Sequence, residues 1–217
     1  MTIRILLVDD HRMMREGLRV LLEGAPDLQI VGQASDGREA LDLVRTLSPD
    51  VVVMDVEMPE LNGVESTRRI CAEYTGVKVI ALSTHTDARN VHHMLEAGAS
   101  GYVLKIAAAD ELVRAVRAVS LGRTYLSPDV AGAVVERATH PNPGSGVSAY
   151  SSLGSREREV LQLVAEGKTS AETAKEMHIS TKTVETHRRN IVQKLGLHGT
   201  AELTKYAVRE GLTSLED

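Results

Sequence analysis

Residues 3–10, IRILLVDD, form an apolar run that ends in two carboxylates, and the same design recurs three times before the middle of the chain. In order, the runs and the polar residues that follow them are IRILLV with Asp9 and Asp10, VVVM with Asp55, KVIAL with Ser83, and GYVL with Lys105. If the runs are parallel strands, these polar residues gather at the carboxyl edge of one sheet, where open α/β folds place their ligand sites. Three carboxylates, a hydroxyl and an ammonium group at one crevice suit a divalent cation and a phosphoryl group.

From residue 3 to about residue 120, short β-rich runs alternate with amphipathic helical stretches, which predicts a flavodoxin-like (βα)5 parallel sheet. Two helices are expected to begin after Asp36 and Asn62, because each is followed three residues later by Glu, in the pattern of a capping box. The expected strands are apolar nearly throughout, as strands covered on both faces should be, and they span 3–8, 28–34, 51–54, 78–82 and 101–104.

The second half of the chain has a different character. Residues 138–152 are rich in Pro, Gly and Ser and are interpreted as a flexible linker, with a short extra helix opening at Pro128 just before it. Beyond the linker no strand-like run remains, and 155–210 predicts four short helices with N-caps at Ser155, Thr169 and Ser180. The expected domains are an α/β unit over 1–122, an extra helix and linker over 123–152, and an all-α unit over 153–217.

Composition excludes several classes of function. The 217 residues are 42% apolar, which is enough for packed cores and argues against a disordered chain. Phe and Trp are absent, which disfavours binding of single strands by base stacking, and the net charge of −5 means that any DNA contact needs a local basic patch. One cysteine, no signal-peptide layout and no apolar run of membrane length together predict a soluble, cytoplasmic protein.

The clustered carboxylates carry the first chemical prediction. They repel one another unless a cation neutralises them, and an all-oxygen ligand set favours Mg²⁺. Lys105 supplies a compact cation and Ser83 a donor for phosphoryl oxygens. Since phosphoryl transfer needs mainly positioning and charge stabilisation, these groups are sufficient for it. No glycine-rich loop follows the first strand, so a nucleotide-binding α/β domain is disfavoured.

Together with Met58-Pro59, Gly63 and Tyr102, these residues resemble the receiver domain of two-component response regulators. The resemblance covers residues 3 to about 120. It implies that Asp55 accepts a phosphoryl group from a sensor histidine kinase. It also implies a Mg²⁺ site, in which Asp10, Asp55 and the backbone carbonyl of Glu57 bind the ion directly and Asp9 binds it through a water.

The same resemblance assigns a switch. Ser83 and Lys105 would hold the phosphoryl oxygens, and an inward movement of Ser83 would draw Tyr102 with it and alter the surface around the last strand. Ile106 departs from the family pattern, which often has Pro there. Glu57 and His85 occupy positions that tune dephosphorylation in this family, and we expect them to set the phosphoryl lifetime.

A second constellation lies in the helical half. The expected helices 170–177 and 181–195, separated by a short turn, have the spacing of a helix-turn-helix, whose second helix enters the major groove of double-stranded DNA. Residues 181–195 carry four basic side chains against Glu185, whereas 151–217 carries 10 basic and 10 acidic residues. The basic charge is therefore concentrated on one helix, which predicts phosphate contacts and salt-dependent affinity.

SREREVL, AEG, ISTKTVETH and KLGL, within 153–210, resemble the LuxR-type effector domain of the NarL family. The resemblance implies that the last helix, 200–210, mediates homodimerisation. It places Lys182, Glu185, Thr186 and Arg189 toward the groove, Thr183 and Arg188 near backbone phosphates, and Val184, Ile191 and Leu195 in the core. Glu185 departs from the frequent Lys of relatives, and it could accept from cytosine N4 or merely weaken phosphate attraction.

The combined prediction is a dimeric, phosphorylation-dependent DNA-binding transcriptional regulator, with no enzymatic activity beyond self-phosphotransfer and autodephosphorylation. One rival is a Mg²⁺-dependent aspartyl-phosphate hydrolase acting on an external substrate, which leaves the DNA helix unexplained. Another is a regulator that responds without phosphate, for which Ile106 leaves some room. Outside these sites, His92 and His93 are interpreted as surface histidines and Met13 as a core residue.

Overall fold

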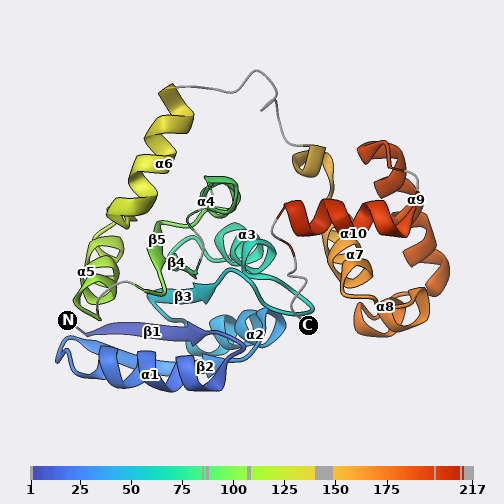
Figure 1. Cartoon of the computed structure of the whole chain (residues 1–217). Helices are drawn as coiled ribbons and strands as arrows, with labels where there is room; N and C mark the ends of the chain where they lie inside the picture. Colours follow the sequence, from blue (N-terminus) through green and yellow to red (C-terminus); the bar gives the residue numbers. More distant parts are fainter. Residues whose placement is uncertain are drawn as a thin grey trace. The chain divides into compact units, whose positions relative to one another are not determined.

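The computed structural model describes residues 2–84, 86, 88–106, 109–139, 149–197, 199–210 and 212. The chain divides into two compact units, Met1–His140 and Pro141–Asp217. The first unit is an α/β sandwich and the second is helical (Figure 1).

A six-stranded parallel sheet forms the centre of the first unit, with strand order β2-β1-β3-β4-β5-β6. Its elements are β1 (Ile3–Val8), α1 (Arg12–Glu23), β2 (Leu28–Ala34), α2 (Gly37–Leu47), β3 (Val51–Asp55), α3 (Gly63–Glu73), β4 (Lys78–Ser83), α4 (Ala88–Glu96), β5 (Gly101–Leu104), α5 (Ala109–Ser120), β6 (Tyr125–Leu126) and α6 (Pro128–Thr139). The five predicted strands are confirmed, and the short edge strand β6 is an addition that the sequence did not predict.

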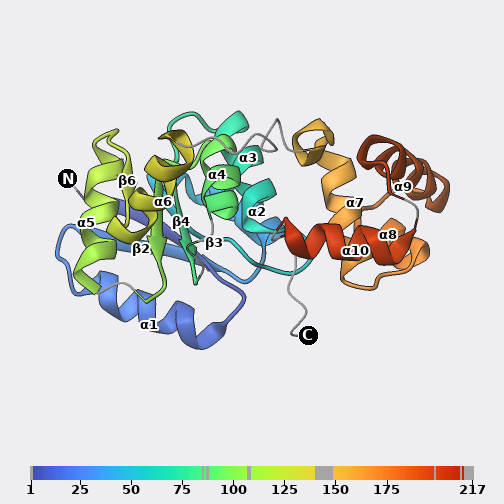
Figure 2. The same ribbon diagram turned by 45° about the horizontal axis from the view of Figure 1, so that its top comes forward.

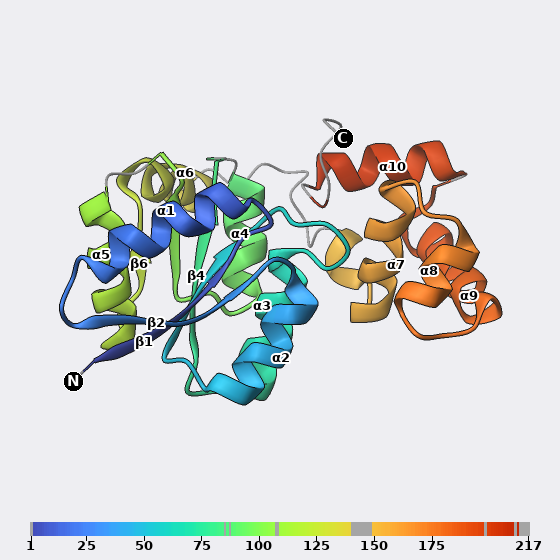
Figure 3. The same cartoon turned by 90° about the horizontal axis from the view of Figure 1, so that it is seen from below.

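Helices cover both faces of this sheet (Figure 3). Ile5, Leu7, Val51 and Val53 pack with α1 and α5, while the residues that alternate with them, such as Leu6 and Val52, pack with α2 and α3. The side-chain period of two thus sends successive apolar residues into two different cores. This is why the strands are apolar throughout.

Local capping fixes where two helices begin. The Asp36 carboxylate accepts the backbone N–H groups of Arg38 and Glu39 at 2.8 and 2.9 Å, and Asn62 Oδ1 accepts that of Glu65 at 2.9 Å. Both predicted N-caps are confirmed. Asp36 does not form a complete capping box, because the Glu39 carboxylate bonds Ser35.

The extra helix α6 packs against α4 (Figures 1 and 2). Val130 of α6 is fully buried in a cluster that also contains Tyr102, Val91 and Met94. The entry to α6 is tied to β5, because the Ser127 N–H donates to the Tyr102 carbonyl at 2.9 Å and Ser127 Oγ accepts the Leu104 N–H at 3.3 Å. The surface beside β5 therefore carries β6 and α6 of the same chain.

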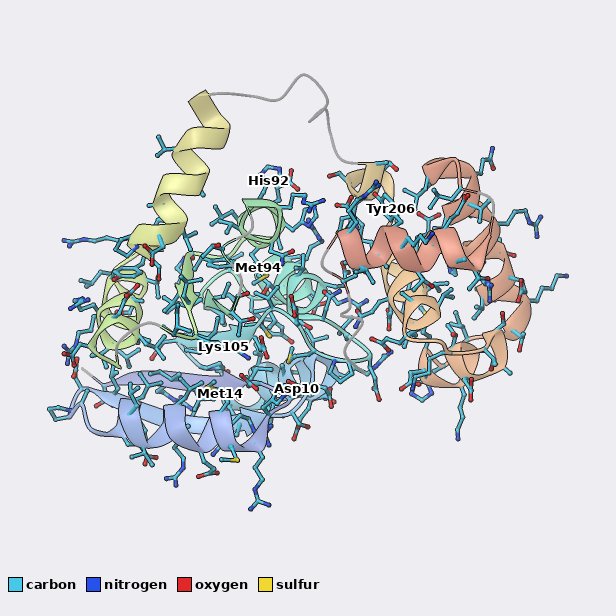
Figure 4. The ribbon with its side chains drawn as sticks, viewed as in Figure 1. Asp10, Met14, His92, Met94, Lys105 and Tyr206 are labelled. Carbon is cyan, nitrogen blue, oxygen red and sulfur yellow. The ribbon has the colours of Figure 1, made fainter. Side chains whose placement is uncertain are left out.

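The second unit contains η1 (Ala149–Ser152), α7 (Ser155–Ala165), α8 (Ser170–Glu176), α9 (Thr181–Leu195) and α10 (Thr200–Arg209). The four predicted helices are confirmed, and their core includes Leu161, Val184, Ile191 and Tyr206, the last labelled in Figure 4. Part of the predicted linker, 140–148, lies outside the described residues. Within the described part of the chain, no helix combines the length and apolar character needed to cross a bilayer.

The predicted N-caps of the second unit are right in two of three cases. Thr169 caps α8 in a capping box with Glu172, and Ser180 caps α9 by accepting the Thr183 N–H at 3.1 Å. Ser155 is instead the first residue of α7, and the N-cap is Gly154. A glycine N-cap has no side chain to accept a bond, and here the Glu157 carboxylate accepts the Gly154 N–H at 2.8 Å.

Candidate functional site

The predicted polar edge of the sheet is present. Strand register places Asp55 opposite Leu82 and Ser83 opposite Leu104. Lys105 follows the last residue of β5, and its N–H donates to the Ser83 carbonyl at 2.7 Å, which places Lys105 beside Ser83 at this edge. Three neighbouring strands thus deliver a carboxylate, a hydroxyl and an ammonium group to one place.

Four side chains at this edge could serve as metal ligands. Carboxylate oxygens of Asp9, Asp10 and Asp55 and a ring nitrogen of His11 all lie within 4.8 Å of one another. His11 Nδ1 is 2.7 Å from Asp10 Oδ1, and the His11 side chain is exposed. The predicted grouping of the three acids is confirmed in space, and it offers the oxygen-rich ligand set that Mg²⁺ prefers.

Lys105 links two of the acids. Its Nζ lies 2.6 Å from Asp55 Oδ2 and 2.8 Å from Asp9 Oδ2, and the side chains of Lys105, Asp55 and Asp9 are nearly buried. Figure 4 labels Lys105 together with the neighbouring acid Asp10. Asp55 Oδ1 accepts the backbone N–H of Glu57 at 3.3 Å. Both oxygens of Asp55 therefore face donors, which is the environment of a group that receives negative charge.

Burial raises the pKa of Asp55 to about 7, helped by the neighbouring Asp9 charge and opposed by Lys105. Burial also lowers the pKa of Lys105, but the charge of Asp55 and hydrogen bonds to both acids outweigh it, so the pKa of Lys105 is raised overall. One ammonium group does not fully compensate this cluster. A divalent cation held by the carboxylates would supply the missing positive charge.

The other predicted switch residues are placed as follows. Ser83 is buried at the end of β4, and Tyr102 is fully buried beneath α4 and α6. Ile106, next to Lys105, is 82% exposed. His85 lies outside the described residues.

In the helical unit, α8 and α9 are joined by the predicted turn, in which His178 has a φ of +53°. Val184 and Ile191 are buried and Leu195 packs partly against the same core, so the predicted inner stripe of α9 is confirmed. The opposite side of the helix is open to solvent. Its exposed members are Lys182, Thr183, Glu185, Thr186 and Arg189.

Two basic residues of α9 are already engaged within the unit. Lys194 Nζ lies 2.7 Å from the Glu157 carboxylate and donates to the Ser152 carbonyl at 3.2 Å. Arg188 is partly buried and donates to the hydroxyls of Ser170 and Thr200, each at 3.1 Å. Glu157 therefore compensates the charge of Lys194, whereas Arg188 is bonded to neutral hydroxyls and keeps its positive charge.

Ser170 and Thr200 are functional candidates that the sequence did not reveal. Ser170 lies 18 residues before Arg188 and Thr200 lies 12 residues after it, and they belong to different helices. A serine one residue after an N-cap carries no signal of such a contact. Only the packing of α8 and α10 beside α9 brings them together.

Residues 5–117 match the response regulator receiver domain family, and residues 151–207 match the luxR family of bacterial regulatory proteins. The chain is 43% identical over 212 residues to the transcriptional regulatory protein LiaR of Bacillus subtilis (strain 168), covering 98% of this chain and 100% of LiaR. It is 37% identical over 214 residues to the response regulator UvrY of Escherichia coli (strain K12), covering 99% and 97%. A crystal structure of a LuxR-family two-component response regulator from an Aurantimonas species has a TM-score of 0.62 and 40% identity, covering 64% of this chain and 100% of that one. The chain therefore belongs to the response regulators of the NarL/LuxR family, transcriptional regulators in which a receiver domain is joined to a LuxR-type DNA-binding domain.

Proposed function

We propose that Asp55 accepts a phosphoryl group from a sensor histidine kinase in the cytoplasm, and that this changes dimerisation and promoter binding. The observation that carries the proposal is the environment of Asp55. Its carboxylate is buried at the end of β3, 2.6 Å from the Lys105 ammonium group and beside two further acids. A buried carboxylate that has a cation on one oxygen, and neighbouring acids that could hold a second cation, is suited to take up negative charge.

In the proposed reaction a carboxylate oxygen of Asp55 attacks the phosphorus of a phosphohistidine. A P–O bond forms, the P–N bond breaks, and the imidazole leaves with the electron pair. Lys105 and Ser83 then donate to the phosphoryl oxygens. Bound Mg²⁺, held by Asp10, Asp55 and the Glu57 carbonyl and by Asp9 through water, would neutralise the charge that develops there.

Tyr102 links this site to the connecting segment in our proposal. Tyr102 is buried in the same cluster as Val130 of α6. It lies two residues before Leu104 on β5, and Leu104 is the strand partner of Ser83. A change in the position of Ser83 would reach α6 through this contact. We propose that the receiver, 1–122, acts in this way through 123–152 on the effector, 153–217.

For the effector we propose that α9 enters the major groove of double-stranded DNA. Lys182, Thr186 and Arg189, on the exposed side, would contact bases, and Thr183 and Arg188 would lie near phosphates. Homodimerisation through 200–210 would match the twofold symmetry of paired half-sites. The relatives LiaR and UvrY, named as a transcriptional regulatory protein and a response regulator, support this assignment.

Size-exclusion chromatography with light scattering tests the phosphoryl switch. The full chain is run with Mg²⁺, with and without beryllofluoride, beside Asp55→Ala and the surface control Asp42→Ala. We expect a monomer-to-dimer shift in the wild type and in Asp42→Ala but not in Asp55→Ala. Intact-mass analysis after acetyl phosphate treatment should show one added phosphoryl group in the same two proteins. Addition of that group to Asp55→Ala would refute the assignment of Asp55.

A further inference from the structure

A single hydroxyl joins the two charged side chains of α9 that flank its DNA-facing side. Ser170 Oγ donates to the Glu185 carboxylate and accepts from Arg188 Nη1 at 3.1 Å. Arg188 Nη2 donates in turn to Thr200 Oγ1 at 3.1 Å. The network therefore connects α8, α9 and α10 around one guanidinium group.

The network fixes the direction of Arg188. A guanidinium group presents five N–H donors in a rigid plane, and two of its nitrogens are bonded here to hydroxyls on two different helices. The remaining donors keep a set orientation at the edge of the exposed side. A planar group held in this way is suited to a phosphate oxygen.

The same hydroxyl restrains Glu185. Glu185 and Arg188 are three residues apart on α9 and are therefore neighbours on its surface, where they could form a direct ion pair. Such a pair would remove one cation from the DNA interface. Ser170 stands between them and satisfies both groups, because it is a donor to one and an acceptor for the other.

We infer that Ser170 is a positioning residue for DNA binding: it holds Glu185 back and keeps Arg188 available for a backbone phosphate. This inference rests on the proposed DNA-binding role of α9 and deepens it. It also assigns Glu185 an internal role in place of base recognition. The ligand contacted by Arg188 is a phosphodiester oxygen, so the effect is independent of base sequence.

The test uses the full chain with Mg²⁺ and beryllofluoride. Base preference is measured by selection from randomised duplex DNA, and affinity for the selected duplex is then measured over a series of salt concentrations. Ser170→Ala should lower affinity about 3- to 10-fold at low salt and flatten the log–log salt dependence by about 0.9, the slope of one phosphate contact. Its base preference should not change. Ser170→Thr keeps the hydroxyl and should behave as the wild type.

Two further variants distinguish the role inferred for Ser170 from the proposed DNA-binding role of α9. In the double variant Ser170→Ala/Glu185→Gln, the neutral amide no longer competes for Arg188, so the wild-type salt slope should return. Arg189→Ala should lose base preference if α9 reads the groove. If Arg189→Ala weakens binding while Ser170→Ala leaves the salt slope unchanged, the inference is wrong and the proposed function stands. A changed base preference in Glu185→Gln would also overturn the inference, whereas an unaffected Arg189→Ala would refute the proposed DNA contact itself.

Discussion

Replacing Asp55 with Asn should stabilise the metal-free protein. The carboxylate is buried and its pKa is raised from 3.8 to about 7, so ionisation of this group opposes folding. A shift of about three pKa units corresponds to about 4 kcal/mol of folding free energy at about 1.4 kcal/mol per unit. Asn resembles the neutral acid in shape, and Lys105 keeps its contact with Asp9 at 2.8 Å.

The effect has a defined pH dependence. Below the ordinary pKa of 3.8 Asp55 is protonated in both states and has no cost. As the pH rises from there to about 7, the unfolded chain has lost this proton while the folded protein retains it, so wild-type stability falls; above about 7 the cost is constant. The stability advantage of Asp55→Asn should therefore grow by about 2 to 3 kcal/mol between about pH 5 and about pH 8.

Urea unfolding of both proteins at several pH values, with a chelator present, measures this difference. Asp42→Asn is the matched control, because the same chemical change is made on α2 at a side chain that is 77% exposed. Its difference from the wild type is the baseline for the change made at Asp55. Added Mg²⁺ should narrow the gap for Asp55→Asn by stabilising only the wild type. If Asp55→Asn is no more stable than the wild type at about pH 8 without metal, the electrostatic account of the site is refuted.

Four other substitutions are predicted from local geometry, and urea unfolding measures the change in stability for each. Lys105→Met should destabilise the metal-free protein by about 2 to 4 kcal/mol at neutral pH, because it leaves buried carboxylates without their cation; an unchanged midpoint would contradict this. Gly63→Ala should cost more than about 2 kcal/mol, since its Cβ would lie 1.9 Å from the Asp55 carbonyl oxygen, whereas Gly17→Ala on the open side of α1 should stabilise slightly. Thr169→Ala removes the N-cap of α8 and should lower the free energy of unfolding by about 1 kcal/mol. A decrease below a few tenths of a kcal/mol would argue against that cap.

The sheet and its polar edge could be predicted because their signals are local. A run such as VVVM followed by Asp55 indicates both the strand and the residue at its carboxyl end. Parallel topology then brings the carboxyl ends of neighbouring strands together. The ion pairs of Lys105 follow from the same geometry. The charge balance does not, because the raised pKa of Asp55 depends on burial that only the folded structure provides.

The predictions that are wrong concern features that tertiary packing determines, such as the burial of a helix residue. His93, predicted on the surface, is buried on α4, while Met13, predicted in the core, is 90% exposed on α1. The two-residue strand β6 is too short for a periodic signal, and it forms because β5 offers a free edge. Ser170 could not be identified for a similar reason, since its partners lie on another helix.

The cost of ionising Asp55 limits what the acidic edge can contribute to the proposed switch. Moving a two-state equilibrium from 1:99 to 99:1 takes about 5.5 kcal/mol of differential binding. The cost of ionising Asp55, about 4 kcal/mol from its pKa, separates the folded from the unfolded chain, so it is an upper bound on what Mg²⁺ and a phosphoryl group at this residue could contribute to a shift between two folded states. In the proposed function the change reaches α6 through Tyr102, a buried residue of β5 in the same cluster as Val130. A protein carrying Tyr102→Leu should therefore still accept the phosphoryl group at Asp55 and gain stability from it. The phosphoryl group should no longer change its dimerisation.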